Sequence, residues 1–355
     1  MHVLITGGAG FIGSHLVEHH IKKGDKVHVI DDLSSGSLEN ILPFMKNDQL
    51  IFDREDILTW PGLEKAVAWS DRIYHMAAVV GVFKVLDNQI KVLSVNITAT
   101  ERLLQAAHNG RWNPQIVIAS TSEVYGHGLH CKRFYGYQAD SNIDGNDINE
   151  RRKYTIEEFK EDMEPMVGSS AVSRWNYSIS KLADEALGLS FARMHNMHVI
   201  VIRLFNTIGP RQTGRYGMVV PRFVKQAVSG RPLTVFGDGL QMRSLCDVRD
   251  TVVALDALAT NPESKGQIVN VGNNREVTMK ELAEMVKERA GSNSPIEYIP
   301  YDKAYGEHFE ETYRRKPNLE KLFRLTHFKH VWTLEDTLDD LIERERRSAS
   351  ETVEA

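Results

Sequence analysis

The chain has 355 residues, of which 42% are hydrophobic and 26% charged, and its formal net charge is -5 at pH 7. This composition can supply the core of one large domain, or of a large and a small one. Acidic and basic residues are interleaved without a basic stripe, so the charge pattern gives no case for nucleic-acid binding and favours a small-molecule partner. With only two cysteines, the chain is not expected to have a disulfide framework. Its N-terminal segment lacks the features of a signal peptide. No apolar run is long enough to span a membrane, so we expect a cytoplasmic protein.

Short β-branched runs alternate with helical patterns through the first half of the chain. The runs begin at 2, 27, 50, 72, 115 and 198 and read HVLIT, VHVI, LIF, RIYHM, QIVIAS and HVIVIRLF. Such alternation predicts an α/β fold of the Rossmann type, with a doubly wound parallel sheet. The polar stretch 127–172 interrupts the pattern, and we expect a surface insertion there with one short helix near 155–163.

After about residue 205 the expected elements become shorter and mixed. Helices are predicted near 219–229, 248–260, 278–290 and 334–347, and strands at LTVF and QIVNVG. This pattern predicts a nucleotide-binding Rossmann domain over 1–205 and a smaller α/β substrate-binding domain over 206–347, some of whose segments return to the first. The last residues, 348–355, are expected to form a frayed tail.

The segment TGGAGFIG follows the first predicted strand and opens a helix, with glycines at Gly7, Gly10 and Gly13. Glycines allow a tight turn and the close approach of a pyrophosphate, whose charge the helix N-terminus then meets. Asp31 follows the second strand, where a carboxylate bonds the adenosine ribose hydroxyls and repels a 2′-phosphate. A lone glycine triad can also be a structural turn, but the strand, the helix and the acid in register predict binding of NAD rather than NADP.

Two histidine patterns raise the question of a metal. HLVEH at 15–19 matches the H-x-x-E-H pattern of some zinc proteases, but its helix must pack on the sheet behind the glycine loop. HGLHC at 127–131 stands in the polar insertion without the second half of a ligand set. We therefore expect no metal site.

The segment YSISK places Tyr177 and Lys181 four residues apart, on one face of a helix. An ammonium beside a phenol stabilises the phenolate and lowers its pKa, which would make Tyr177 a base. Together with the glycine loop, Thr121 and Asn96, this pair resembles the short-chain dehydrogenase/reductase superfamily. The resemblance is to its extended, nucleotide-sugar branch and covers nearly the whole chain through GGAGFIGSHL, DDLSSG, DREDI, HMAA, STSEVYG, YSISK, RLFNTIGPRQTGRYG, FGDGLQMRSLCDVRD and RRKPN.

The resemblance implies a set of site residues and a homodimer built through helices near 92–109 and 175–194. The residues implied for the cofactor NAD are Gly7, Gly10, Phe11, Ile12, Gly13, Asp31, Asp56, Ile57, Ala77, Ala78, Asn96, Tyr177 and Lys181. Those implied for a nucleotide-sugar substrate, in most cases UDP-linked, are Asn206, Val219, Thr234, Phe236, Arg243 and Arg315. The implied catalytic residues are Tyr177, Lys181, Thr121, Ser122, Glu123 and Arg243.

Members of this branch share a first step, in which the tyrosine takes a proton from the sugar 4-hydroxyl while NAD accepts the C4 hydride. At the position of Glu123, in STSEVYG, the decarboxylases and dehydratases of this branch carry a glutamate, whereas its epimerases usually have a small or neutral residue. By this resemblance the chain is closer to the decarboxylases and dehydratases. The resemblance favours UDP-glucuronate decarboxylation, with Thr121 or Ser122 polarising the C4 oxygen, Glu123 acting near C5, and Arg243 acting near the carboxylate or as a proton donor.

Other activities stay open at this point. They are a 4-epimerase of a UDP-hexose or UDP-uronate, and a sugar 4,6-dehydratase. A non-enzymatic NAD-binding sensor is disfavoured because such proteins tend to lose the tyrosine or the lysine. Two departures from the decarboxylase pattern are the long insertion after STSEVYG and Asn318 in RRKPN.

Overall fold

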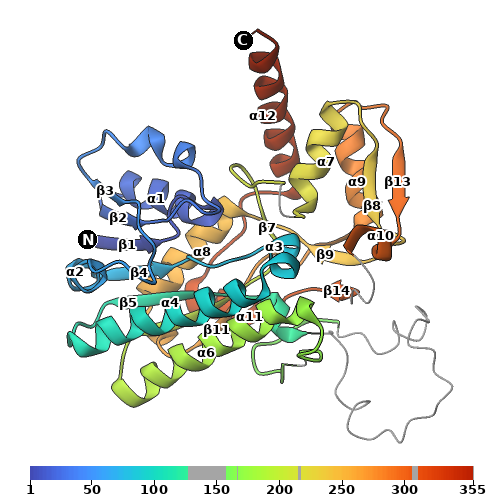
Figure 1. Cartoon of the computed structure of the whole chain (residues 1–355). Helices are drawn as coiled ribbons and strands as arrows, with labels where there is room; N and C mark the ends of the chain where they lie inside the picture. The colour runs from blue at the N-terminus through green and yellow to red at the C-terminus, as the bar shows by residue number, and fades with distance from the viewer. Residues whose placement is uncertain (127–156, 166, 215–216, 306–310, 355) are drawn as a thin grey trace, which may run out of the picture.

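A seven-stranded parallel sheet forms the centre of the molecule (Figure 1). The computed structural model describes the chain except residues 127–156, 166, 215–216, 306–310 and 355. The sheet order is β11-β6-β5-β4-β1-β2-β3, which confirms the expected doubly wound Rossmann fold. Its strands are β1 (His2–Thr6), β2 (Lys26–Ile30), β3 (Leu50–Asp53), β4 (Arg72–His75), β5 (Gln115–Thr121), β6 (Val199–Leu204) and β11 (Ile268–Val271).

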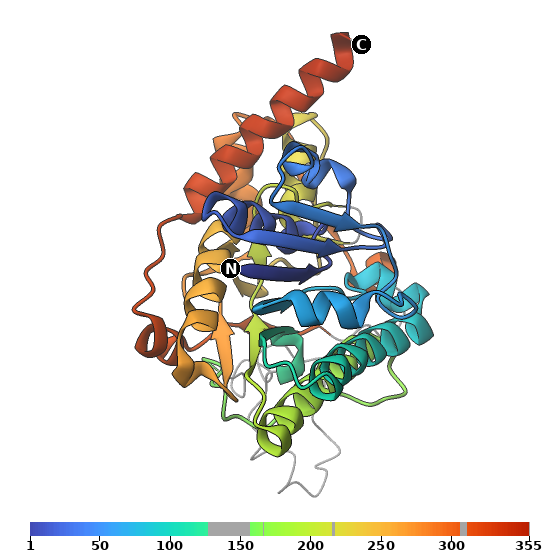
Figure 2. The same cartoon turned by 90° about the vertical axis from the view of Figure 1, so that its left-hand side faces the viewer.

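Helices cover both faces of this sheet, as its central strands require, because their valine and isoleucine side chains are buried on both sides. One face carries α1 (Phe11–Lys22), α8 (Val248–Thr260) and α11 (Glu320–Thr326). The other carries α2 (Leu63–Trp69), α4 (Gln89–Asn109) and α6 (Asn176–His195). Figures 1 and 2 show α4 and α6 lying side by side along the molecule.

A second group of elements has its own core, centred on Phe223, Leu282 and Leu338. Its helices are α7 (Val219–Val228), α9 (Met279–Arg289) and α12 (Leu334–Glu354), which pack near the parallel pair β8 (Leu233–Phe236) and β13 (Ile296–Ile299). The remaining elements are β7 (Thr207–Ile208), β9 (Met242–Ser244), β10 (Cys246–Asp247), β12 (Glu276–Thr278), β14 (Arg314–Arg315), α3 (Val82–Asp87), α10 (Tyr301–Tyr305), and the short 3-10 turns η1 (Leu38–Asn40), η2 (Leu42–Phe44), η3 (Ser122–Tyr125), η5 (Ser173–Trp175) and η6 (Pro262–Ser264).

The structure differs from the sequence predictions at two places. No helix forms over 157–163, where Phe159 instead makes an isolated bridge with Pro317. The reason is that Phe159 is almost fully buried, and its backbone N–H donates to the carbonyl of Lys316 at 2.8 Å. Helix α12 continues to Glu354 instead of ending near 347, and it projects from the body of the molecule (Figure 2).

Two further observations bear on the sequence predictions. The HGLHC segment and the larger part of the polar insertion lie outside the described residues. Among the helices that the structure describes, none is long and apolar enough to cross a membrane.

Candidate active site

The turn between β1 and α1 is packed so tightly that only glycine fits at two positions. Gly7 has a φ of +70°, and a Cβ added there would lie 2.7 Å from the backbone nitrogen of Ala77. A Cβ on Gly13 would lie 2.2 Å from the carbonyl oxygen of Gly7. Gly10 precedes α1 without any side-chain cap, so the first N–H groups of that helix face the turn. The turn therefore leaves room for a pyrophosphate at the helix N-terminus.

Asp31 lies at the carboxyl end of β2, and the chain holds its carboxylate in place through backbone groups. One oxygen accepts from the N–H of Ala9 at 2.9 Å, and the other accepts from the N–H of Leu33 at 2.8 Å. Burial raises the pKa of Asp31, and these two hydrogen bonds oppose that shift. Because each carboxylate oxygen can accept a further bond, Asp31 can also bind the hydroxyls of a ribose.

A cavity of about 620 Å³ runs from the glycine turn, across the carboxyl ends of the central strands, to the second group of elements. This edge of the sheet includes the switch point between β1 and β4, where open α/β sheets bind their ligands. The predicted residues that line the cavity are Gly7, Gly10, Phe11, Ile12, Gly13, Asp31, Asp56, Ile57, Ala77, Ala78, Thr121, Ser122, Glu123, Tyr177, Lys181, Asn206, Val219, Phe236, Arg243 and Arg315.

Two predicted residues do not line the cavity. Asn96 is buried in α4, where its side-chain oxygen accepts from the N–H of Val79 at 2.8 Å and its amide donates to Ser180 at 3.0 Å. It therefore holds the loop after β4 in place. Thr234 points toward α7, and its hydroxyl accepts from Gln226 at 3.0 Å.

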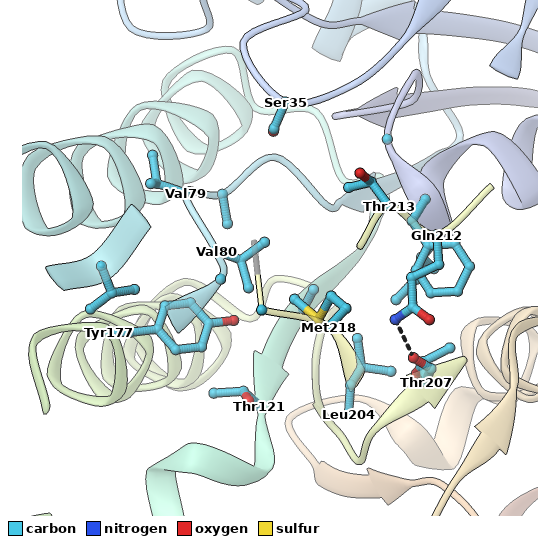
Figure 3. Close-up of a pocket in the computed structure, with 18 of the residues that line it drawn as sticks. Ser35, Val79, Val80, Thr121, Tyr177, Leu204, Thr207, Gln212, Thr213 and Met218 are labelled. Carbon is cyan, nitrogen blue, oxygen red and sulfur yellow. Dashed lines mark hydrogen bonds between the residues drawn. The ribbon is translucent and has the colours of Figure 1, made fainter. Parts of the chain in front are cut away.

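Tyr177 reaches into the middle of the cavity from the start of α6. Figure 3 shows its phenol facing Met218, with Thr121 at the end of β5 nearby and Gln212 and Thr213 on the opposite side. Burial raises the pKa of Tyr177, the charge of Glu123 acts in the same direction, and hydrogen bonding to Thr121 opposes both. The phenol must therefore lose its own proton before it can accept one from a group held against Thr121.

Lys181 lies one helical turn after Tyr177, as the sequence predicts, but its ammonium has an additional partner. Its Nζ donates to a carboxylate oxygen of Asp184 at 3.0 Å, and both side chains are almost fully buried. The raised pKa of Tyr177 differs from the sequence interpretation, in which the lysine lowers it. The physical reason is the burial of the phenol together with two carboxylates, Glu123 and Asp184, whose charges act on it.

Glu123 is held between two arginines. Its Oε2 accepts from Arg174 of η5 at 2.8 Å, and its Oε1 pairs with Arg315 of β14. Burial alone would raise the pKa of Glu123, but the two guanidinium groups hold it well below its usual range. Glu123 is therefore a carboxylate at neutral pH.

A second ion pair lies beside the first. Arg243 of β9 pairs with Glu311 at 2.6 Å and also donates to the carbonyl of Met242 at 2.8 Å. Burial lowers the pKa of Arg315, Glu123 opposes this, and the charges of Arg243 and Arg174 lower it further. These charges are close enough to act on one another. We call Glu123, Arg174, Arg243, Glu311 and Arg315 the arginine cluster.

The far end of the cavity is aromatic. The guanidinium of Arg222 lies 3.9 Å from the ring centroid of Phe236, and Tyr305 meets the same ring edge-on with centroids 5.2 Å apart. Between the two ends, the amide of Asn206 donates to the carbonyl of Ser244 at 3.1 Å. Such a surface suits a flat nucleotide base beyond a polar middle section.

Sequence reasoning missed several residues that line the cavity. Arg174 stands in SRWNYSISK, three residues before Tyr177, so a search for cations flanking the catalytic pair could have found it. Glu311 and Arg222 carry no such signal, because only the fold brings them to the cavity.

Comparisons with known proteins agree with this architecture. The model of the "NAD dependent epimerase/dehydratase family" matches residues 3–272. The UDP-N-acetyl-alpha-D-glucosaminuronate decarboxylase of Bacillus cytotoxicus is 33% identical over 96% of this chain and 96% of its own length. UDP-glucuronic acid decarboxylase 1 of Arabidopsis thaliana is 33% identical over 90% of this chain and 64% of its own length. The solved UDP-glucuronic acid 4-epimerase of Bacillus cereus, in complex with UDP-glucuronic acid and NAD, has a TM-score of 0.81 at 25% identity, covering 98% of this chain and 100% of that one.

Proposed function

Because the chain belongs to the NAD-dependent epimerase/dehydratase family, we propose that it decarboxylates a UDP-linked uronate through transient oxidation of the sugar at C4. The main support for this proposal is the arginine cluster. It contains three guanidinium groups but only two carboxylates, and it lines the same cavity as Tyr177. The surplus positive charge suits a sugar carboxylate and has no counterpart in the neutral hydroxymethyl group of a hexose. The decarboxylases of Bacillus cytotoxicus and Arabidopsis thaliana support the same choice.

The residues of the first half fit NAD. The glycine turn admits a pyrophosphate, Asp31 bonds the adenosine ribose, and Lys181 orients the ribose next to the reacting atoms. When bound, NAD accepts the C4 hydride and later returns it. Residues 1–205 thus bind the cofactor, and residues 206–347 bind the nucleotide sugar. The nucleotide base of that sugar lies against Phe236 and Arg222.

The side chains around the sugar supply the remaining chemistry. Once ionised, the phenolate of Tyr177 takes the proton of the 4-hydroxyl while Thr121 holds the oxygen of that hydroxyl. The resulting 4-keto uronate is a β-keto acid, so its C5–C6 bond can break with loss of CO2 while the electron pair moves to the C4 oxygen. Thr121 and the phenol of Tyr177, which now carries the 4-hydroxyl proton, stabilise that enolate, and C5 then takes a proton from water. Glu123 acts by fixing Arg174 and Arg315 around the carboxylate, not by donating a proton.

A second candidate is 4-epimerisation of a UDP-uronate. Its supporting observation is the likeness to the Bacillus cereus UDP-glucuronic acid 4-epimerase. The arginine cluster would hold the carboxylate in the same way, and the reaction would end with return of the hydride to the other face of the ketone. The two candidates differ in whether the C5–C6 bond breaks and in the face of the C4 ketone to which the hydride returns.

Product analysis separates these candidates. We would incubate the protein and NAD with UDP-glucuronate, UDP-N-acetylglucosaminuronate, UDP-glucose, GDP-mannose and thymidine-linked glucose, and analyse the products by mass spectrometry and NMR. The proposal predicts loss of CO2 from a UDP-uronate and no product from the neutral hexoses. An isomer of unchanged mass would favour the epimerase, and loss of water would indicate a dehydratase.

Tyr177→Phe provides the matched test of the base. The substitution removes only the phenolic oxygen, so turnover should fall by at least about a thousandfold. NAD affinity, measured by fluorescence titration, should stay within about twofold because the ring still fills its place. Turnover close to that of the unsubstituted protein would remove Tyr177 from the mechanism.

The same proposal includes a cytoplasmic homodimer, joined through the outer faces of α4 and α6. Support comes from two apolar side chains on these helices, Ile90 and Met194, which are 85% and 77% exposed in the single chain. Light scattering should give the mass of two chains, and Met194→Glu should reduce it toward one. A monomer at all concentrations would contradict the dimer, and cell fractionation would test the location.

A further inference from the structure

Asp184 is a buried carboxylate that the reaction described above does not use. It lies in α6 three residues after Lys181, its side chain is 0% exposed, and its Oδ2 accepts from the lysine Nζ at 3.0 Å. Burial raises the pKa of Asp184, and the charge of Lys181 and the hydrogen bonds with Lys181 and Thr100 oppose that shift. Burying a carboxylate costs free energy unless it is paired. Packing alone therefore does not explain why an acid occupies this position. Its pairing with Lys181 explains it.

The charged groups around this pair come from several elements. Burial lowers the pKa of His75 in β4 to about 3, and the charge of Lys181 adds to the shift, so the imidazole is neutral. Its Nδ1 is hydrogen-bonded to the hydroxyl of Thr6 at 2.7 Å, and its Nε2 to the hydroxyl of Thr100 at 3.1 Å. The histidine therefore brings no charge to the lysine.

The other neighbouring acids already have strong partners. Glu185 in α6 is held by Arg203 of β6 through two hydrogen bonds of 2.9 and 2.8 Å. Glu123 of η3 is held by the two arginines of the arginine cluster. Asp184 thus differs from both, because the cation that it holds is the catalytic lysine.

We propose that Asp184 is a positioning residue that fixes the direction of the Lys181 ammonium and offsets its charge, and so sets the pH range in which Tyr177 acts as a base. One of the three ammonium protons is committed to Asp184, which fixes the directions of the other two. The proposal rests on the proposed function in that Tyr177 must be the base.

The effect on the phenol follows from the sign of the charge. Asp184 carries a negative charge next to Lys181 and raises the pKa of Tyr177, after the larger effects of burial and of Glu123. While Asp184 is charged, the phenolate that acts as the base forms only at higher pH. Removal of the Asp184 charge should therefore stabilise the phenolate and lower the pKa of Tyr177.

Asp184→Asn tests this with little change in shape. The ascending limb of the kcat/KM profile against pH should move to lower pH by about one unit, because one nearby like charge has been removed. Asp184→Glu, which keeps the charge, should leave the limb within a few tenths of a unit. If the asparagine variant does not fold, Asp184→Ser removes the same charge with a smaller side chain and should show the same shift.

A substrate-independent measurement keeps the two proposals separable. The NAD-loaded protein is titrated with base while its ultraviolet absorbance is recorded, and the same titration of Tyr177→Phe is subtracted. The difference reports the phenolate of Tyr177 directly. The pH midpoint of phenolate formation should be lower when Asp184→Asn is present. This result stands even if none of the tested nucleotide sugars is turned over, an outcome that would reject only the proposed function.

Asp256→Asn is the matched control for lost stability. Asp256 lies in α8 and pairs with Arg72 at 2.6 Å, with 13% of its side chain exposed. Its substitution should destabilise the fold without moving either pH dependence. The role of Asp184 would be overturned if Asp184→Asn left both the ascending limb of the kcat/KM profile and the phenolate midpoint unchanged, or moved them to higher pH.

Discussion

Glu123→Gln is the substitution that most sharply examines the arginine cluster. It removes one negative charge from between Arg174 and Arg315, whose side chains are each only 9% exposed. Breaking a buried ion pair by removing one partner costs about 3–5 kcal/mol. Because 21% of the Glu123 side chain is exposed, we expect a smaller loss, about 2–4 kcal/mol in the free energy of unfolding.

Urea unfolding at pH 7 measures this loss, and Glu343→Gln is its matched control. Glu343 also pairs with an arginine, Arg347, but both lie exposed on α12, 62% and 70% respectively, so the same substitution should cost less than about 1 kcal/mol. Turnover of a UDP-uronate should fall at least about tenfold in Glu123→Gln, because the two guanidinium groups lose their fixed orientation. NAD affinity should not change.

The pH dependence of the same variant gives an independent check. The two arginines hold the pKa of Glu123 below its usual range, so its contribution to stability is fully present above the pKa of an unfolded glutamate, about 4.3. That contribution is lost as the pH falls through the lower, folded value. The stability difference between Glu123→Gln and the unsubstituted protein should therefore shrink in acid. Equal stability and equal turnover at pH 7 would refute the reasoning.

Two further predictions concern the cofactor end of the cavity. Gly13→Ala should weaken NAD binding at least about tenfold by fluorescence titration, because its Cβ would lie 2.2 Å from the Gly7 carbonyl oxygen; unchanged affinity would contradict the tight turn. Asp31→Ser should reduce the ratio of NAD to NADP affinity at least about tenfold, since the carboxylate that repels a 2′-phosphate is gone. An unchanged ratio would show that other groups exclude NADP.

Local patterns allowed the sheet and the cofactor site to be predicted from the sequence. The strand at His2–Thr6, the glycines after it and Asp31 at the end of the next strand are set by short-range chemistry. Their positions follow from the strand and helix periods and from turns that only glycine fits. The expected parallel sheet was therefore confirmed.

The partners of charged residues could not be predicted in the same way. Glu123 and Arg315 are 192 positions apart in the chain, and they meet only because η3, which follows β5, and β14 converge on the cavity. The sequence therefore predicted the carboxylate of Glu123 at the site without its two arginine partners. The absence of a helix over the described residues 157–163 has a similar cause, because the bridge between the buried Phe159 and Pro317 is a long-range contact.

The most direct test of the proposed reaction follows the carboxyl carbon of the substrate. UDP-glucuronate or its N-acetylated relative, isotopically labelled at the carboxyl carbon, is mixed with the protein and NAD, and the label is followed by NMR. Decarboxylation predicts that the label leaves as CO2 and bicarbonate while an unlabelled UDP-pentose or UDP-amino-pentose accumulates. Label that stays in a nucleotide sugar with inverted C4 would contradict decarboxylation and establish the epimerase.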